Sequence, residues 1–289
     1  GNVQLGLTST PATTGALVCR SSVDNSLTNC QMAFVTSALQ VSGIPRYAEE
    51  AGTLSISALQ ASSSNPRACV PLFASQNKML TLKCNYADPA SGTVPARIQN
   101  KDGSYIPLAA NTGSACSTAG AAVQLAFDGN GLATPNMLYA DAGVLSLTAT
   151  YASTSGSDSG LTLTGSGPVI VGPKYFVFSG IATPQAAGLA VAPLAPASSI
   201  TVTALAADNK TVTRNFGRES TPPTLQLTPA VEAPVFDGAQ KPAVTGSVAF
   251  TGSNGAGTAS NLSWPEVGTL RFTASIPTYL GATLPALPA

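Results

Sequence analysis

Three stretches of the chain share one pattern of apolar and polar positions. In each, an acidic residue is followed two positions later by a glycine, and apolar residues then occupy every second position up to an alanine. The apolar positions are Leu54, Ile56 and Ala58 in the first stretch, Leu145, Leu147 and Ala149 in the second, and Leu270, Phe272 and Ala274 in the third. Because alternate side chains of a strand point to opposite faces of a sheet, each stretch predicts a strand with one buried and one exposed face.

The acid and the glycine at the start of each stretch predict a corner that leads into the strand. The pairs are Glu50 and Gly52, Asp141 and Gly143, and Glu266 and Gly268, each preceded by an aromatic residue, Tyr47, Tyr139 or Trp264. Glycine suits a turn or a close approach of the backbone, and the acid can accept backbone N–H bonds across the corner. The alternative is that three ordinary amphipathic strands resemble one another by chance.

We therefore expect an all-β protein built from tandem immunoglobulin-like β-sandwich domains. Such domains contain a corner of this kind and use about 100 residues each, which fits the spacing of the three motifs. The 27 Gly and 22 Pro residues punctuate the chain as they do in sandwiches. The expected domains are a divergent N-terminal sandwich at residues 1–74, an immunoglobulin-like sandwich at 75–173, and a third at 174–289 that carries an insertion.

Composition narrows the chemistry that the chain can perform. Only 9% of the residues are charged and the formal net charge is zero, so the clustered basic residues that nucleic-acid binding needs are missing. The chain has no histidine, which excludes Ser-His-Asp and Cys-His catalysis, histidine-ligated zinc, and a histidine proton shuttle. Catalysis by paired carboxylates remains open. We expect no enzymatic activity and no cofactor.

Five cysteines lie in the first 116 residues, and they contain no Cys-x-x-Cys pair. We interpret them as disulfides formed in an oxidising compartment, with Cys19–Cys30 and Cys69–Cys84 as the expected pairs. Cys84–Cys116 is the alternative pairing, and buried reduced thiols are the alternative state. The sequence does not decide between them.

Two further groups of polar residues are considered as candidate sites. Asp128 and Asn130 resemble the start of a calcium loop, but the further acids and the distal glutamate of such a loop are missing, so a plain turn is expected. Arg214, Arg218 and Glu219 form the densest charge cluster, which we expect on a solvated hairpin edge.

Export is expected, but membrane insertion is not. No apolar run reaches the ~18–20 residues that a membrane-spanning helix requires. The sequence begins with a glycine and contains no signal peptide, which is typical of a processed form or of a piece of a longer chain.

Several motifs together resemble one known family. They are the segments 215–223, 139–143 with the alternating leucines after it, 171–177, and 264–268 with 279–281 downstream. Taken in their order along the chain, they cover most of it, and they resemble the MshQ-like proteins of mannose-sensitive haemagglutinin (MSHA) type IV pilus clusters.

The resemblance implies pilus assembly or adhesion at the pilus tip by large, modular proteins outside the cytoplasm. It assigns no catalytic residue. We expect a non-enzymatic, rod-like segment of a bacterial surface adhesin that is exported through the periplasm to the cell surface or beyond. The expected partners are other pilus or surface-fibre subunits, with a host or environmental glycan as a further candidate.

Two other functions remain open. One is a self-polymerising subunit of an extracellular filament or sheath, joined through strand edges or donated termini, which the uncharged, threonine-rich segment 1–14 would allow. The other is a carbohydrate-binding or carbohydrate-active module that works through carboxylates.

Overall fold

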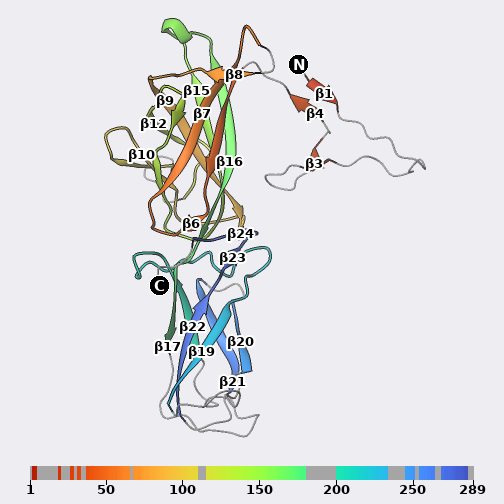
Figure 1. Cartoon of the computed structure of the whole chain (residues 1–289), viewed down its shortest axis with the longest axis vertical. Coiled ribbons are helices and arrows are strands. Elements are labelled where there is room, and N and C mark those ends of the chain that lie inside the picture. The colour runs from red at the N-terminus through yellow and green to blue at the C-terminus, as the bar shows by residue number, and fades with distance from the viewer. Residues whose placement is uncertain are drawn as a thin grey trace, which may run out of the picture.

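Two β-sandwiches joined end to end form the body of the protein (Figure 1). The computed structural model describes residues 2–4, 19–20, 27–28, 31–33, 37–65, 68–109, 115–179, 200–233, 245–250, 254–263 and 268–285. In these ranges the one helical element is a short 3₁₀ turn, η1 (Gly156–Asp158), and no helix is long and apolar enough to cross a membrane. The predicted all-β fold with tandem sandwiches is confirmed.

The first sandwich spans residues 37–172 and consists of two sheets. The seven-stranded sheet contains β5 (Ser37–Gly43), β7 (Gly52–Ala61), β8 (Cys69–Pro71), β10 (Arg97–Gln99), β11 (Tyr105–Pro107), β13 (Leu132–Ala133) and β14 (Asn136–Leu138). The five-stranded sheet has the order β12 (Ala121–Ala126), β9 (Asn77–Asp88), β15 (Gly143–Ala152), β16 (Thr162–Gly172) and β6 (Arg46–Tyr47). Strands β6 and β16 form a short parallel pair, whereas β9, β15 and β16 pair antiparallel.

The predicted buried faces of β7 and β15 are confirmed. Their alternating apolar residues are at most 3% exposed and belong to one core: Leu54, Ile56 and Ala58 of β7, and Leu145, Leu147 and Ala149 of β15. Because the two strands lie in different sheets of the same sandwich, their shared sequence pattern marks the two facing layers of one domain.

Two glycines of β16 allow the two sheets to approach closely along one side of this sandwich. A Cβ atom on Gly165 would lie 1.9 Å from the carbonyl oxygen of Leu39, and one on Gly167 would lie 2.0 Å from that of Val41. Only glycine therefore lets β5 pass so close to β16, and this contact brings the edges of the two sheets together.

The structure has no domain boundary between residues 74 and 75, where the sequence predicts one. Strand β7, which the sequence places in an N-terminal domain, pairs with β13 and β14, which it places in the next. All three strands contribute to one core, so the predicted boundary is not a domain boundary. The apolar alternation of a strand is the same whether its partner lies in the same sandwich or in another, and therefore it gives no information on this point.

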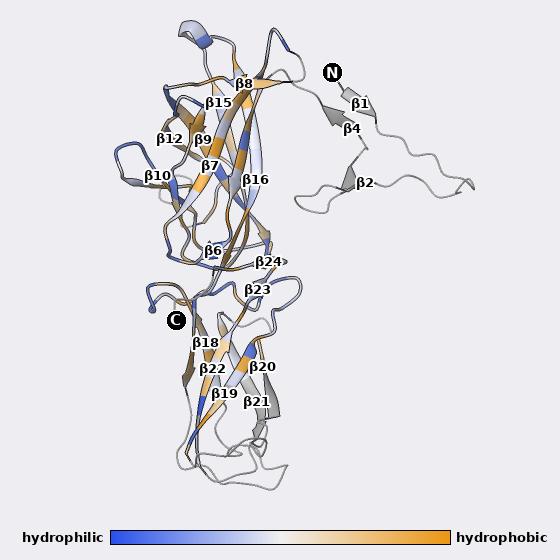
Figure 2. Cartoon of the chain, viewed as in Figure 1, coloured by the Kyte–Doolittle hydropathy of each residue, from blue (hydrophilic) through white to orange (hydrophobic). Residues whose placement is uncertain are grey.

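The second sandwich begins after Pro173 and Lys174. One sheet has the order β17 (Tyr175–Ser179), β18 (Ile200–Leu205), β21 (Ala256–Ser263) and β20 (Thr245–Ala249), and the other pairs β19 (Gln226–Ala233) with β22 (Thr269–Ser275). Hydrophobic residues recur along β7 of the first sandwich and β22 of the second (Figure 2). The hairpin of β23 (Thr278–Tyr279) and β24 (Ala282–Thr283) then brings the chain back to the junction of the sandwiches (Figure 1).

Four short strands precede the first sandwich. Strand β1 (Asn2–Gln4) pairs with β4 (Gln31–Ala33), and β2 (Cys19–Arg20) pairs with β3 (Leu27–Thr28). Within the part of the chain that the structure describes, none of these strands joins a sheet of either sandwich.

Candidate functional site

A hydrogen-bonded polar region lies at the junction of the two sandwiches. The backbone N–H of Ala48 donates to the carbonyl of Gly172 (2.8 Å), and the N–H of Lys174 donates to that of Leu205 (2.8 Å). The N–H of Ala207 in the second sandwich donates to the carbonyl of Ala48 (2.8 Å). The backbone groups of these three bonds thus have hydrogen-bond partners, as buried backbone groups require.

Asp141, the acid of the second corner motif, lies inside this junction and is 2% exposed. Its Oδ1 accepts the N–H of Ala142 (2.8 Å) within the corner and the N–H of Asn215 (2.8 Å) from the second sandwich. Burial raises the pKa of Asp141 to about 6, while the two N–H donors and the charges of Arg214 and Arg218 act in the opposite direction. The acid accepts a bond from the adjacent residue within its corner and also links the sandwiches.

Glu219 is the second buried carboxylate of the junction and is 4% exposed. Its Oε2 accepts the N–H of Gly217 (2.7 Å) and its Oε1 accepts the hydroxyl of Tyr279. Burial raises the pKa of Glu219 and also that of Tyr279. The predicted solvated edge is therefore wrong for this residue, because the fold covers a charge cluster that looks exposed in the local sequence.

Polar contacts also surround the buried acids at the rim. Both oxygens of Asp88 accept bonds from Ser220, one from its N–H and one from its hydroxyl (2.8 Å each). The Arg218 guanidinium donates to the hydroxyl of Ser91 (3.1 Å). Each of these bonds joins one sandwich to the other.

The first corner motif also faces the junction, but in a different way. The Glu50 carboxylate pairs with Lys174 at 3.4 Å, and their side chains are 44% and 16% exposed. Of the third motif, Glu266 and Trp264 lie outside the described residues, and Gly268 directly precedes β22. Among the described corners, both acids therefore lie at the junction, and Asp141 is the buried one of the two.

The glycines of the two described corners meet different requirements. A Cβ on Gly52 would lie 2.7 Å from Nη1 of Arg46, whose buried guanidinium donates to the carbonyls of Gly52 and Thr53. Gly143 instead has φ +134°, and a Cβ there would lie 2.6 Å from the carbonyl oxygen of Asp88. The glycine of this motif thus leaves room for an arginine side chain in one sheet. In the other sheet it adopts a backbone conformation with positive φ that other residues rarely take.

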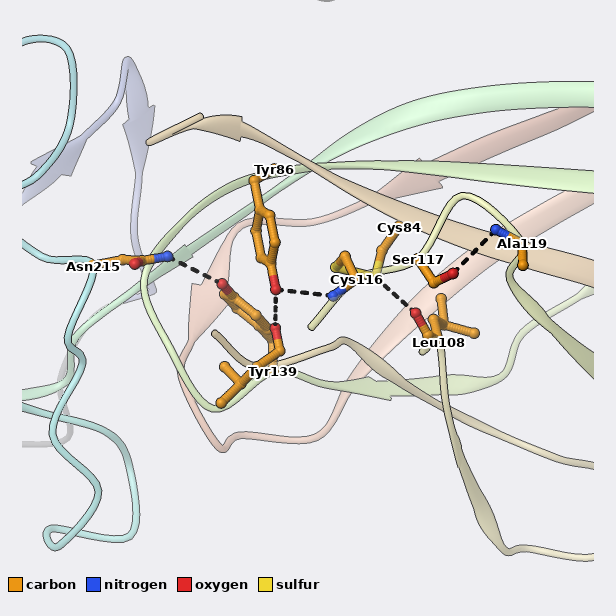
Figure 3. The surroundings of a disulfide bond; sticks show 9 residues. Cys84, Tyr86, Leu108, Cys116, Ser117, Ala119, Tyr139 and Asn215 are labelled. Carbon is orange, nitrogen blue, oxygen red and sulfur yellow. Dashed lines mark hydrogen bonds between the residues drawn. A yellow bond between two sulfur atoms is a disulfide. The ribbon is translucent and has the colours of Figure 1, made fainter. Parts of the chain in front are cut away.

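A disulfide lies close to the junction. Cys84 is joined to Cys116 with their Cα atoms 5.2 Å apart, and the N–H of Cys116 donates to the hydroxyl of Tyr86 (3.0 Å; Figure 3). Tyr139 lies beside Tyr86, and its hydroxyl accepts a bond from the side-chain amide of Asn215 (3.4 Å; Figure 3). The disulfide loop is therefore connected through two tyrosines to the second sandwich.

The expected Cys69–Cys84 disulfide is not formed. Cys84 points into the core from β9 and bonds to Cys116, the alternative partner, whereas Cys69 on β8 is exposed and free. Cys30 lies outside the described residues, so the Cys19–Cys30 pair stays a prediction.

Asp128 and Asn130 form a turn. The carboxylate of Asp128 accepts the N–H groups of Asn130 (2.8 Å) and Leu132 (2.9 Å), and these bonds lower the pKa of Asp128. In the ranges that the structure covers, no group of three or more Cys, Asp or Glu side chains could hold a metal ion.

The C-terminal part of the described chain packs against the junction. The Tyr47 hydroxyl donates to the carbonyl of Pro285 (2.5 Å), beside a groove of about 370 Å³. Leu284 is buried, and a Cβ on Gly172 would lie 2.6 Å from its Cδ1. After the strands of the second sandwich, the C-terminal segment of the described chain thus packs between the two sandwiches.

Sequence reasoning singles out Glu50 and Asp141 as corner residues but does not place them at a junction; it misses Asn215 and Tyr279, and it misplaces Glu219. The last three lie in segments that carry the family resemblance, and this is the signal that could have identified them. Chemically, both carboxylates accept hydrogen bonds. Asp141 joins the two domains through Asn215, whereas Glu219 bonds to Gly217 and Tyr279 within the second sandwich.

The match to a protein family covers most of the first sandwich. No curated protein matches the chain. A family model described as "Domain of unknown function (DUF6701), first Ig-like domain" matches residues 16–166, from the N-terminal strands to the middle of β16. Because this match covers more than half of the 289 residues, the chain belongs to the DUF6701 first Ig-like domain family.

Proposed function

We propose that the protein is a non-enzymatic, rod-like segment of a bacterial surface adhesin, in which two immunoglobulin-like sandwiches are held in a fixed orientation. The observation that carries this proposal is the buried polar junction. Asp141, Asn215, Glu219 and Tyr279 are each at most 4% exposed there. Domain motion is expected unless an interface has a hydrophobic part, and here the core of the second sandwich also includes Tyr47 and Ala142 of the first.

The connection between the sandwiches supports a stiff arrangement. Only Pro173 and Lys174 separate β16 from β17, and Pro173 fixes its own φ angle. The N–H of Lys174 is bonded to Leu205. Such a short and hydrogen-bonded linker limits rotation of one sandwich against the other.

Secretion and the pilus are the finer parts of the proposal. The Cys84–Cys116 disulfide fits an oxidising compartment. The pilus association rests on the resemblance of segments such as 139–143 and 215–223 to MshQ-like proteins. Its expected partners are other pilus or surface-fibre subunits.

Distance measurements between the far ends of the two sandwiches test the rod. Ser157 in η1 and Glu232 near the end of β19 are exposed and lie on strands or turns far from the junction. With spin labels attached through non-canonical amino acids at these positions, we expect one narrow distance distribution. A broad distribution would refute the rod.

The surface assignment has its own test in the cells that make the protein. We expect a protease added outside intact cells to remove it and mechanical shearing to release it with the pili. Recovery from the cytosol with Cys84 and Cys116 reduced would refute the assignment.

Self-polymerisation remains a second candidate because of one feature of the second sandwich. Strand β17 lies at the edge of its sheet and exposes Tyr175 (37%) and Val177 (44%). An exposed edge with apolar side chains is a site where another strand can add. Filaments in electron micrographs of the purified protein would favour this function, and a monodisperse monomer would exclude it.

A further inference from the structure

The junction contains two buried carboxylates that form no ion pair with a cationic side chain among the described residues. Asp141 comes from the first sandwich and Glu219 from the second, and both are nearly inaccessible. The ion pairs of the described residues involve neither of them. A buried carboxylate without a paired charge is unfavourable when it is ionised, and it becomes neutral more easily than one in water.

The surroundings of the two acids are mostly neutral. The charge of Asp141 acts on the phenols of Tyr86, Tyr139 and Tyr279 and raises their pKa values, and the positive charges that act on Asp141 are those of Arg218 and Arg214. Arg214 is exposed and Arg218 is partly exposed, so water screens both.

Glu219 has a similar environment. It faces the hydroxyl of Tyr279 and the negative charge of Asp88. Here the nearest charge therefore adds to the effect of burial, because it also disfavours the ionised form.

We propose that this junction is a lock controlled by protons, in which protonation of Asp141, supported by Glu219, tightens the docking of the second sandwich on the first in mildly acidic surroundings. The proposal rests on the rod proposed above and adds a means of regulating it. Separation of the sandwiches would free Asp141 from its contact with Asn215 and expose it to water, and it would move the charge of Asp88 away from Glu219; both changes favour the ionised carboxylates. Only the docked state therefore favours the proton.

The Asp141 carboxyl determines the direction in which pH changes the docking equilibrium. Its pKa is raised from 3.8 to about 6 in the docked state, so between these values the docked state holds more protons than the separated state. Docking strengthens as the pH falls through 6, levels off near the ordinary pKa, and is independent of pH well above 6. Between pH 7.5 and pH 5 the docking equilibrium constant is expected to rise about tenfold.

Amide hydrogen exchange of Asn215 in the full chain measures this equilibrium. Its N–H donates to Asp141, and it exchanges when the junction opens. After correction for the intrinsic exchange rate, we expect a protection factor about tenfold larger at pH 5 than at pH 7.5. An equal or smaller factor at pH 5 would overturn the proposal.

Matched variants identify the group responsible. Asp141→Asn keeps an oxygen for both N–H donors but has no charge, so we expect high protection at both pH values. Glu219→Gln is expected to reduce the pH dependence in part. Asp128→Asn is the control, because Asp128 is exposed in a turn of the first sandwich and its pKa is lowered; it should leave the pH dependence intact.

A direct titration covers the case in which Asp141→Asn fails to fold. Carbon NMR of the unaltered chain should give an apparent pKa near 6 for the Asp141 carboxyl, and a value near 4 would overturn the proposal. The outcomes separate this inference from the rod itself. A narrow distance distribution together with an Asn215 protection factor that does not change with pH refutes the lock alone, whereas a broad distribution at every pH refutes the rod.

Discussion

The two sandwiches bury their apolar side chains in different ways. In the first, the core extends through the whole space between its sheets, and Ala206 is the one residue that the second sandwich contributes to it within the described ranges. In the second, the buried core includes Tyr47 and Ala142 of the first sandwich and gathers around Phe216. The first sandwich therefore has a core of its own, whereas the second completes its core on the end of the first.

The aromatic side chains show the same difference. Phe216 packs against Phe250, Phe176 and Tyr279, with ring centroids 4.9, 5.5 and 5.7 Å apart, all close to the junction. In the first sandwich, Phe73 packs edge to face on Phe127 and Tyr151 (5.4 and 4.8 Å) in a core that also contains the disulfide-bonded Cys84. The difference suggests a hierarchy of stability, in which the second sandwich needs the first but not the reverse.

The largest expected effect concerns the centre of the second core. Phe216→Ala removes a fully buried ring and should lower the stability of the second sandwich by about 3–5 kcal/mol. Calorimetry of the full chain should then show two transitions, with that of the first sandwich unchanged. A single transition that shifts as a whole would contradict the hierarchy.

Removal of the disulfide tests the hierarchy from the other side. Cys84 and Cys116 are separated by 32 residues, and closing such a loop stabilises a domain by roughly 2–4 kcal/mol. In the double variant Cys84→Ser/Cys116→Ser, both sandwiches should lose stability, because the second depends on the first. Cys69→Ser is the matched control, since that exposed thiol is free, and its melting curve should equal that of the unaltered chain.

The sequence predicts which face of a strand is buried, but it does not predict which strands pair with one another. The alternation at Leu54 and Leu145 correctly identifies the buried side of each strand, because the period of two is a local property. It does not show that these strands belong to facing sheets of one domain. That relation depends on pairings such as Asn136 with Thr53, which lie far apart along the chain.

The polar junction is hidden from sequence reasoning for the same reason. Glu219 sits beside Arg218 in a segment that looks solvated, but the fold buries it and bonds it to Gly217 and Tyr279. Cys84 and Cys116 likewise meet because β9 directs Cys84 inward. Asp141 is predicted correctly as a corner residue, but its bond to Asn215 depends on the docked domain.

A smaller effect is expected at the contact between the end of β16 and the C-terminal segment. In Gly172→Ala the new methyl group would lie 2.6 Å from Leu284 Cδ1 and 3.2 Å from Tyr279. Because a leucine side chain can shift, we expect a loss of about 1–2 kcal/mol, confined to the second sandwich. In a Leu284→Ala background the loss should nearly vanish, and an undiminished loss in a double-mutant cycle would show that this contact is not its cause.

The smallest effect is expected at the ion pair of the first corner motif. Glu50 and Lys174 join the sandwiches across a partly exposed surface, where such pairs contribute about 0–1 kcal/mol and weaken with salt. Glu50→Gln should therefore lower the stability of the second sandwich by less than about 1 kcal/mol in denaturant titrations, and high salt should remove the difference. Asp141 occupies the same position of the same motif but is buried, so its replacement by Asn should change the pH dependence of docking, which Glu50→Gln should leave intact. If the two substitutions had equal effects, burial would not be what distinguishes the two corners, and the dependence of the second sandwich on the first would need another cause.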